Sequence, residues 1–217
     1  MNLGAISYQW GIRLYGAGIR VAALFQPKAR KWVKGRADIW HTLRHLPNRQ
    51  NRKTLWFHAA SLGEFEQGRP VIEAMRQQFP NAFILVSFFS PSGYEARQHY
   101  ATADAVVYLP LDTKQNAQRW VDLVQPDLAV FIKYEIWPHY LQALQRLGAT
   151  TLLMAARFYP KQIFFSRWGK WMAKAIHRFD HILLQEEGTA CSRFCVFERP
   201  EESSERKDGD RQGQAVS

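Results

Sequence analysis

From residue 54 onward, short runs of apolar, β-branched and aromatic residues alternate with longer stretches whose apolar positions recur every three or four residues. The first pattern is typical of buried strands and the second of amphipathic helices. The helical spacing is clearest at residues 71–79 and 141–147. Strands that alternate with helices form βαβ units, so the chain is predicted to be an α/β protein with a doubly wound parallel sheet. The expected strands cover residues 55–59, 83–89, 105–109, 128–132, 151–155 and 182–185.

Residues 3–25 form one apolar and aromatic stretch that contains Arg13 and Arg20. These arginines are seven residues apart and lie on one face of a helix, so the stretch predicts an N-terminal amphipathic helix. It could lie in a membrane interface or pack on the protein's own core, and both alternatives stay open. A membrane-spanning helix would place Arg13 near its middle, at a cost of about 2.5 to 3.5 kcal/mol. Because no positive charge precedes the stretch, we expect no signal peptide and a cytoplasmic protein.

Positive charge is concentrated before the first expected strand. Residues 1–53 contain eleven lysines and arginines and one acid, Asp38, and so account for the whole net charge of +10. A basic arm of this kind attracts anionic partners. Nucleic acid is not expected, because the rest of the chain has no RNP, KH, zinc-finger or helix-turn-helix pattern. The arm therefore predicts contact with an anionic membrane surface, to which each basic residue contributes about 1 kcal/mol.

These patterns divide the chain into a basic helical arm at 1–53, an α/β domain at 54–187 and a tail at 188–217. In the tail, apolar residues gather only at 194–197, and acidic, basic and small polar residues follow. Such a composition buries too little apolar surface to offset the entropy of ordering, so the tail is expected to be disordered. Its cysteines, Cys191 and Cys195, have no second pair to complete a zinc site, so we expect no metal.

Two glutamates come directly after expected strands. Glu64 lies at the strand-to-helix turn after residues 55–59, and Glu135 follows residues 128–132. Ligands of parallel sheets bind beyond the carboxyl ends of the strands, which makes Glu64 a candidate general base. Each glutamate also has a structural alternative. Ser61 and Glu64 have the spacing of a capping box, and Glu135 has the position of a first-turn acid favoured by the helix dipole.

Three stretches of sequence are informative together. They are WFHAASLGEFEQGRPVIEAMR at 56–76, VSFFSPSGYEAR at 86–97 and VVYLPLDTKQNAQRWVDLVQPDLAVFIKYEIWPHYL at 106–141. In this order they closely resemble the N-terminal domain of bacterial 3-deoxy-D-manno-octulosonic acid (Kdo) transferases, over roughly residues 1–187. Two segments depart from the family pattern. Residues 133–138 lack the second acid and the Thr or Ser of many relatives, and Ala-Ala-Arg at 155–157 replaces the usual Asn-Ala-Arg.

The resemblance implies a GT-B glycosyltransferase of which this chain is the Rossmann-like N-terminal acceptor domain. It implies an inverting reaction in lipopolysaccharide biosynthesis, in which a glucosamine hydroxyl of a lipid A precursor (lipid IVA) attacks the anomeric carbon of Kdo and CMP departs. Glu64 then resembles the general base, and Glu135 resembles a residue that stabilises the transition state. The donor is CMP-Kdo, neither a cofactor nor a metal is implied, and the enzyme is placed on the cytoplasmic face of the inner membrane.

Further candidates for contacts with the acceptor lie at or just beyond the expected strand ends. Gly63 could let a ligand approach the turn closely or supply an unusual backbone angle. Helix capping is the alternative for the serines, and surface solvation is the alternative for Lys133 and Arg157, which could bind phosphate or carboxylate groups. His58 is expected to be a hydrogen-bonded structural histidine. The candidates for acceptor binding are Ser61, Gly63, Ser90, Ser92, Lys133 and Arg157.

The second GT-B domain, which carries most contacts to CMP-Kdo in the family, has no recognisable counterpart in these 217 residues. The loss of pattern near residue 188 is therefore interpreted as a truncation or frameshift, and this chain alone is expected to be inactive. An alternative function is a non-catalytic module that binds lipid at a membrane surface. Such a module would retain the acceptor crevice without the ability to bind CMP-Kdo.

Overall fold

The computed structural model describes residues 3–47, 49, 51–133, 135–156, 174–185 and 194–198. Its helices are α1 (Leu3–Ala22), α2 (Pro27–Lys34), α3 (Ile39–Arg44), α4 (Leu62–Gln78), α5 (Pro91–Arg97), α6 (Lys114–Val124) and α7 (Pro138–Leu147). Its strands are β1 (Thr54–Ala59), β2 (Phe83–Phe88), β3 (Ala105–Tyr108), β4 (Leu128–Ile132), β5 (Thr150–Ala156), β6 (His181–Gln185) and β7 (Phe194–Glu198).

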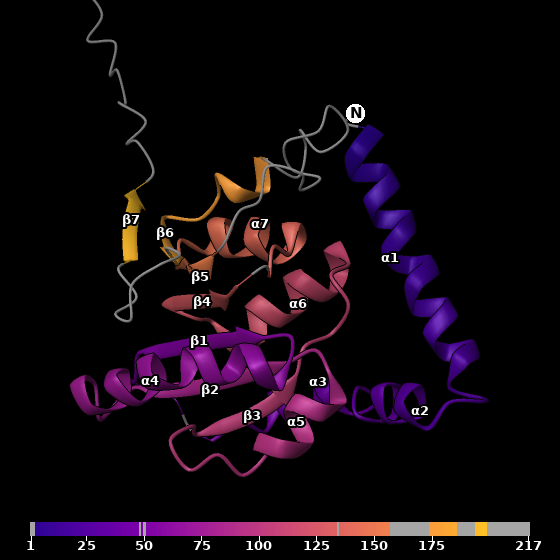
Figure 1. Ribbon diagram of the computed structural model, residues 1–217, viewed down its shortest axis with the longest axis horizontal. Coiled ribbons are helices and arrows are strands. Elements are labelled where there is room, and N and C mark those ends of the chain that lie inside the picture. The colour runs from indigo at the N-terminus through magenta and orange to yellow at the C-terminus, as the bar shows by residue number, and fades with distance from the viewer. Residues whose placement is uncertain are drawn as a thin grey trace, which may run out of the picture.

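The strands form one seven-stranded sheet in the order β3-β2-β1-β4-β5-β6-β7 (Figure 1). Strands β1 to β6 pair in parallel, and β7 is antiparallel to β6. The order reverses direction at β1, from which the chain winds first toward β3 and then, through β4, toward β6. This is the Rossmann-like order and confirms the predicted α/β fold with a doubly wound parallel sheet.

Large side chains fill both faces of the central strands. Because successive side chains of a strand point to opposite faces, Trp56 lies on the face covered by α3, α6 and α7, while Phe57 lies on the face covered by α4. Trp56, Trp120 and Tyr140 pack at ring-centroid distances of 5.3 to 6.2 Å on the first face. Truncating one such buried aromatic residue costs about 3 to 5 kcal/mol, so these two layers hold the strand ends in fixed positions.

The distribution of charge predicted a domain boundary at residue 53, but the hydrophobic core extends across that position. Helix α3 lies within the basic arm, yet Ile39 and Leu43 are only 5% and 1% exposed and belong to the core cluster that contains Trp56. The expected disorder of residues 188–217 is wrong for residues 194–198, which pair with β6 as β7. Backbone pairing with a neighbouring strand orders this short apolar segment, which composition alone did not indicate.

Helix α1 runs along one side of the domain (Figure 1) and has two different faces. On its inner face, the Tyr8 hydroxyl donates to Asp112 Oδ2 at 2.8 Å, and buried Gly16 lies directly against Leu111. Its outer face exposes Trp10, Leu14 and Val21, and the same apolar surface continues past the helix end. The inner face therefore confirms that the segment packs on the protein's own domain, and its placement in a membrane interface stays a prediction. Among the helices that the structure describes, none is long and apolar enough to cross a membrane.

Candidate active site

Glu64 lies where β1 ends and α4 begins, at the carboxyl edge of the sheet. Its Oε2 atom accepts hydrogen bonds from the backbone N–H groups of Ala60, at 2.7 Å, and Ser61, at 3.0 Å. The Ser61 hydroxyl accepts the N–H of Glu64 at 3.4 Å, so the capping box is present. No hydrogen bond from the described residues reaches Oε1. Capping and catalysis therefore do not exclude each other, because the capping hydrogen bonds occupy one oxygen and none from the described residues occupies the other.

The half-buried environment of Glu64 changes its acidity. Burial raises the pKa of the Glu64 carboxyl above its ordinary value, and the negative charge of Glu135 raises it further. The two backbone hydrogen bonds and His58 act in the opposite direction without cancelling the rise. A carboxylate with a raised pKa is a stronger base, which suits the abstraction of a proton from an alcohol.

Glu135 lies between β4 and α7 and is only 9% exposed. Its Oε2 atom accepts the Trp137 indole N–H at 2.6 Å and lies 3.2 Å from His58 Nε2. Helix α7 begins at Pro138 with Trp137 as its N-cap, and its first turn contains no acid. The alternative of a first-turn helix acid is therefore wrong, because Glu135 precedes the helix and its side chain is held by the neighbouring strand.

Asp112 is a buried acid at the same edge that sequence patterns did not single out. Its Oδ1 accepts the N–H of Tyr140 at 3.0 Å, and its Oδ2 accepts the N–H of His139 at 3.1 Å and the Tyr8 hydroxyl at 2.8 Å. Burial raises the pKa of Asp112 to about 6 despite these three hydrogen bonds. The carboxylate joins α1 to the start of α7, and the only available signal was an acid three residues after the end of an expected strand.

The predicted serine and glycine contacts have mixed outcomes. The Ser90 hydroxyl caps α5 by accepting the N–H of Gly93 at 3.2 Å, which confirms the capping alternative for this residue. Ser92 is exposed, and its hydroxyl lies 3.2 Å from that of Ser90. Gly63 is exposed, and a Cβ added there would meet no atom within 4 Å. Its φ is not in the left-handed region, so the alternative of an unusual backbone angle is wrong and open space beside the turn remains.

The backbone is strained just past the end of β4. Lys133 has φ +69°, and Ala155, near the end of the neighbouring β5, has φ +54°. Left-handed conformations of residues other than glycine are costly and concentrate at functional sites. Asn tolerates this conformation better than Ala does, and the sequence resemblance implies Asn at the position of Ala155. Arg157 lies outside the described residues.

The basic arm reaches this edge through Arg36, which sequence patterns also missed. Its guanidinium donates to the carbonyl oxygens of Phe89, at 2.6 Å, and Leu109, at 2.9 Å, and lies 3.8 Å from the centre of the Trp32 ring. The Phe89 ring in turn lies 5.2 Å from the ring of Trp137, which holds Glu135. Arm and candidate site are thus in contact, and no local sequence signal links two segments so far apart along the chain.

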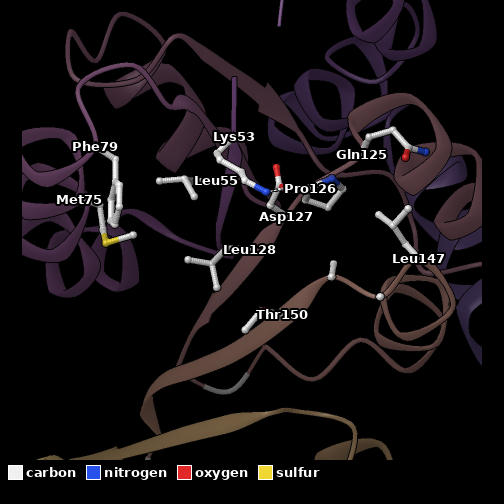
Figure 2. A pocket seen from close by; sticks show the side chains of 12 residues that line it. Lys53, Leu55, Met75, Phe79, Gln125, Pro126, Asp127, Leu128, Leu147 and Thr150 are labelled. Carbon is white, nitrogen blue, oxygen red and sulfur yellow. Dashed lines mark hydrogen bonds and ion pairs between the residues drawn. The ribbon is translucent and has the colours of Figure 1, made fainter. Parts of the chain in front are cut away.

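A cavity of about 580 Å³ lies at the opposite, amino edge of the sheet (Figure 2). Leu55, Leu128 and Thr150, from the starts of β1, β4 and β5, line it. The side chains of Lys53 and Asp127 point toward each other there and form an ion pair at 2.7 Å. None of the candidate site residues lines this cavity. Among the described residues, no group of three His, Cys, Asp or Glu side chains has the arrangement of a metal site.

The strand order and the two glutamates beyond adjacent strands β1 and β4 define a Rossmann-like domain with a candidate base at its carboxyl edge. The model of the 3-deoxy-D-manno-octulosonic-acid transferase (kdotransferase) family matches residues 36–203. The chain therefore belongs to the Kdo transferase family. The match begins within the basic arm and extends past residue 187, where sequence patterns had placed the end of the domain.

Individual relatives agree with the family match. Over 152 residues the chain is 28% identical to the 3-deoxy-D-manno-octulosonic acid transferase of Haemophilus influenzae, which covers 68% of this chain and 35% of the relative. Over 102 residues it is 34% identical to the 3-deoxy-D-manno-octulosonic acid transferase of Chlamydia muridarum, a match that covers 46% of this chain and 24% of the relative. Over 88 residues it is 32% identical to the transferase of Aquifex aeolicus, a match that covers 39% of this chain and 23% of the relative. The matched regions thus span between about a quarter and a third of these curated relatives.

Proposed function

We propose that this chain forms the acceptor domain of an inverting Kdo transferase, which moves Kdo from CMP-Kdo to a hydroxyl group of a lipid A precursor in lipopolysaccharide biosynthesis. The family match supports the class of reaction. One observation carries the assignment to this site: Glu64 has one oxygen fixed by backbone amides and the other without a described partner, close enough to Glu135 for that charge to raise its pKa. A fixed carboxylate with a raised pKa is suited to general base catalysis.

In the proposed reaction, the acceptor hydroxyl oxygen forms a bond to the anomeric carbon of Kdo on the face opposite CMP. The bond from that carbon to the phosphate oxygen breaks, and CMP leaves with the electron pair. The hydroxyl proton moves to Glu64 Oε1. Positive charge that develops at the sugar ring is favoured by the negative charge of Glu135. A positioned base of this kind contributes about 10² to 10⁴ in rate.

We further propose that α1 and α2 attach the protein to the cytoplasmic face of the bacterial inner membrane. The outer face of α1 and the turn after it expose Trp10, Leu14 and Phe25 to 59%, 68% and 79%. Helix α2 adds basic residues directly beside this apolar surface. Apolar burial and attraction to anionic lipid are two anchoring signals, which together suffice for stable peripheral binding.

The same surface supports a second candidate, a non-catalytic module that binds lipid at the membrane. The two candidate functions differ in whether the carboxyl edge of the sheet catalyses transfer of Kdo. Binding to liposomes alone therefore does not distinguish them. Flotation with anionic and neutral vesicles tests the attachment that they share. We expect binding that depends on anionic lipid and weakens with salt. Equal binding to both vesicle types would contradict the electrostatic part of the proposal.

The transferase itself is tested with a chimera. The matched segment of the Haemophilus influenzae transferase is replaced by residues 36–203 of this chain, and CMP release and the mass of the lipid product are measured with CMP-Kdo and a Kdo-free lipid A precursor. We expect addition of Kdo. In parallel, calorimetry of the 217-residue chain with the precursor tests acceptor binding directly. A folded chimera that binds both substrates without transfer would favour the non-catalytic module.

A further inference from the structure

We propose that His58 is a positioning residue for Glu135. With its ring held by Ser87, it donates from Nε2 to the Glu135 carboxyl group and keeps that group fixed beside Glu64. The effect of His58 on catalysis rests on the function proposed above. The position of the imidazole proton and the contact with Glu135 do not depend on that function. Sequence patterns had assigned His58 only a structural role.

The direction of the hydrogen bonds begins at Trp56, whose indole N–H can only donate. It lies 2.8 Å from Ser87 Oγ, which therefore accepts this proton. The single hydroxyl hydrogen of Ser87 can then point toward His58 Nδ1, which lies 2.9 Å from Ser87 Oγ. If Nδ1 accepts, the imidazole proton is on Nε2, which lies 3.2 Å from Glu135 Oε2. The Trp56 indole, the Ser87 hydroxyl and the His58 imidazole then each donate to an acceptor, and the last acceptor is the carboxyl group of Glu135.

A ring protonated on Nδ1 alone fits less well. A proton on Nδ1 alone, directed at the Ser87 carbonyl oxygen 3.1 Å away, would leave the Nε2 lone pair facing the carboxylate of Glu135.

Strand pairing fixes the imidazole ring. His58 on β1 is the register partner of Ser87 on β2 and of Phe131 on β4. The rings of Phe131 and Trp137 each lie edge-on to it, with centroids 6.0 Å away. A ring enclosed by neighbouring strands cannot turn without breaking both nitrogen contacts. Its Nε2 atom is therefore held toward Glu135 by the sheet itself.

Glu135 is consequently held by two N–H donors on one oxygen, from His58 and from Trp137. Three titratable groups act on or are affected by this carboxylate: His58 from β1, Glu64 from α4 and Tyr8 from α1. Its charge raises the pKa of Glu64. Loss of the donor from His58 would free the Glu135 side chain to move away from Glu64. Glu135 would then contribute less to the raised pKa of Glu64, which would rest mainly on burial.

Two variants separate positioning from packing. In H58Q the amide nitrogen reaches the place of Nε2 and can still donate to Glu135. In H58N the shorter side chain places its amide near Nδ1, so it keeps the Ser87 contact and loses Glu135. Both remove the ring, so a residue that only fills space predicts equal effects. The exposed His99 provides H99N as a control for the loss of a histidine.

The experiment uses the 217-residue chain labelled with ¹⁵N in histidine and ¹³C in glutamate side chains. We expect the His58 nitrogens of the wild type to show a proton on Nε2. We expect the Glu64 carboxyl to titrate at lower pH in H58N and close to wild type in H58Q and H99N. In the chimera, kcat should fall about tenfold to hundredfold in H58N with KM unchanged, as for the loss of one hydrogen bond to a charged group.

A His58 ring that is protonated on Nδ1 alone would overturn the proposal, and this measurement needs no variant to fold. Equal effects of H58Q and H58N on Glu64 would also overturn it. The outcomes are distinct from those of the transferase test. A chimera without transferase activity contradicts the proposed function, while the tautomer and the Glu64 titration still decide the role of His58.

Discussion

The two edges of the parallel sheet hold the same kinds of acidic residue in opposite electrostatic settings. At the amino edge, Asp104 accepts from Arg52 at 2.7 Å, from Arg76 and from the N–H of Ile84. Burial alone would raise the pKa of Asp104, but these donors outweigh it and lower the pKa. The ion pair of Asp127 with Lys53 and a hydrogen bond from the N–H of Thr54 lower the pKa of Asp127 in the same way.

At the carboxyl edge, Glu64, Glu135 and Asp112 accept hydrogen bonds from backbone amides, indole, imidazole and phenol groups. Among the described residues, no lysine or arginine forms an ion pair with any of the three. Burial therefore dominates, and it raises the pKa of Glu64 and of Asp112. The comparison shows how one fold separates two uses of a carboxylate. Acids paired with cations hold loops together, whereas acids held by neutral donors keep the basicity that chemistry requires.

The largest effect is expected at the carboxyl edge, from Glu64→Gln. Glutamine can still accept the capping hydrogen bonds but cannot take a proton, so kcat of the chimera should fall about 10² to 10⁴ while its melting temperature changes little. Glu66→Gln is the matched control on the same helix, because the carboxylate of Glu66 is already paired with Arg97 and Arg69. Transfer by Glu64→Gln at the wild-type rate would refute the assignment of the base.

A smaller effect is expected from the pH dependence of Asp112. Its pKa is about 6 in the folded chain, above its ordinary value of 3.8. The unfolded chain therefore loses this proton at lower pH than the folded chain does, and the group's contribution to stability is lost as pH rises from about 4 to 6. Relative to Asp112→Asn, the wild type should lose about 2 to 3 kcal/mol of unfolding free energy across that range, measured by urea denaturation.

The sign of that change is the decisive feature. The acids of the amino edge contribute more to stability as pH rises. This contribution is the same in the wild type and in Asp112→Asn, so the difference between the two proteins does not contain it. A wild type that becomes more stable relative to the variant between pH 4 and 6 would show that hydrogen bonds, and not burial, control Asp112. The carboxyl edge would then resemble the amino edge.

The smallest effect is expected at the amino edge, from Asp104→Asn. Asparagine loses the charge that Arg52 and Arg76 share, and the side chain of Asp104 is 19% exposed, so solvent moderates the loss. We expect about 1 to 2 kcal/mol less stability at pH 7, with no effect on transfer by the chimera. The folded pKa is lowered, so the difference should be present above pH 4 and disappear as pH falls through the folded pKa.

Asp122→Asn serves as the control for this variant, because Asp122 is exposed and, among the described residues, its carboxylate accepts a hydrogen bond only from Gln118. It should change stability by less than about 0.5 kcal/mol. If Asp104→Asn is as harmless as this control, or if it alters transfer, the division of roles between the two edges fails.

The fold was predictable because its signals are local and repeated. Each expected strand from 55–59 to 182–185 corresponds to a strand of the sheet, with boundaries within one or two residues. The capping box at Ser61 and Glu64 was equally legible, since both partners lie within one helical turn. Charge was less informative: it placed a boundary at residue 53, although Leu43 is part of the core.

The relations within the candidate site were not predictable. His58, Ser87 and Glu135 come from three separate segments, and only the register of β1 with its neighbours brings them together. Asp112 gave no pattern, because its partners Tyr8 and Tyr140 lie on helices far apart in the chain. Reasoning from strand ends and short motifs found Glu64 and Glu135 but not the distant donor of Glu135, and it missed Asp112 altogether.

The sequence by itself determined the α/β class, the order of strands and helices, and the presence of an acid at the end of the first strand. Each of these follows from hydrophobic periodicity or from contacts between residues close along the chain. The tertiary structure alone decided which donors surround each acid and how much water reaches it. Those two quantities control the protonation of Glu64 and Asp112, because the electrostatic environment of a buried group is built by residues from other elements of the fold.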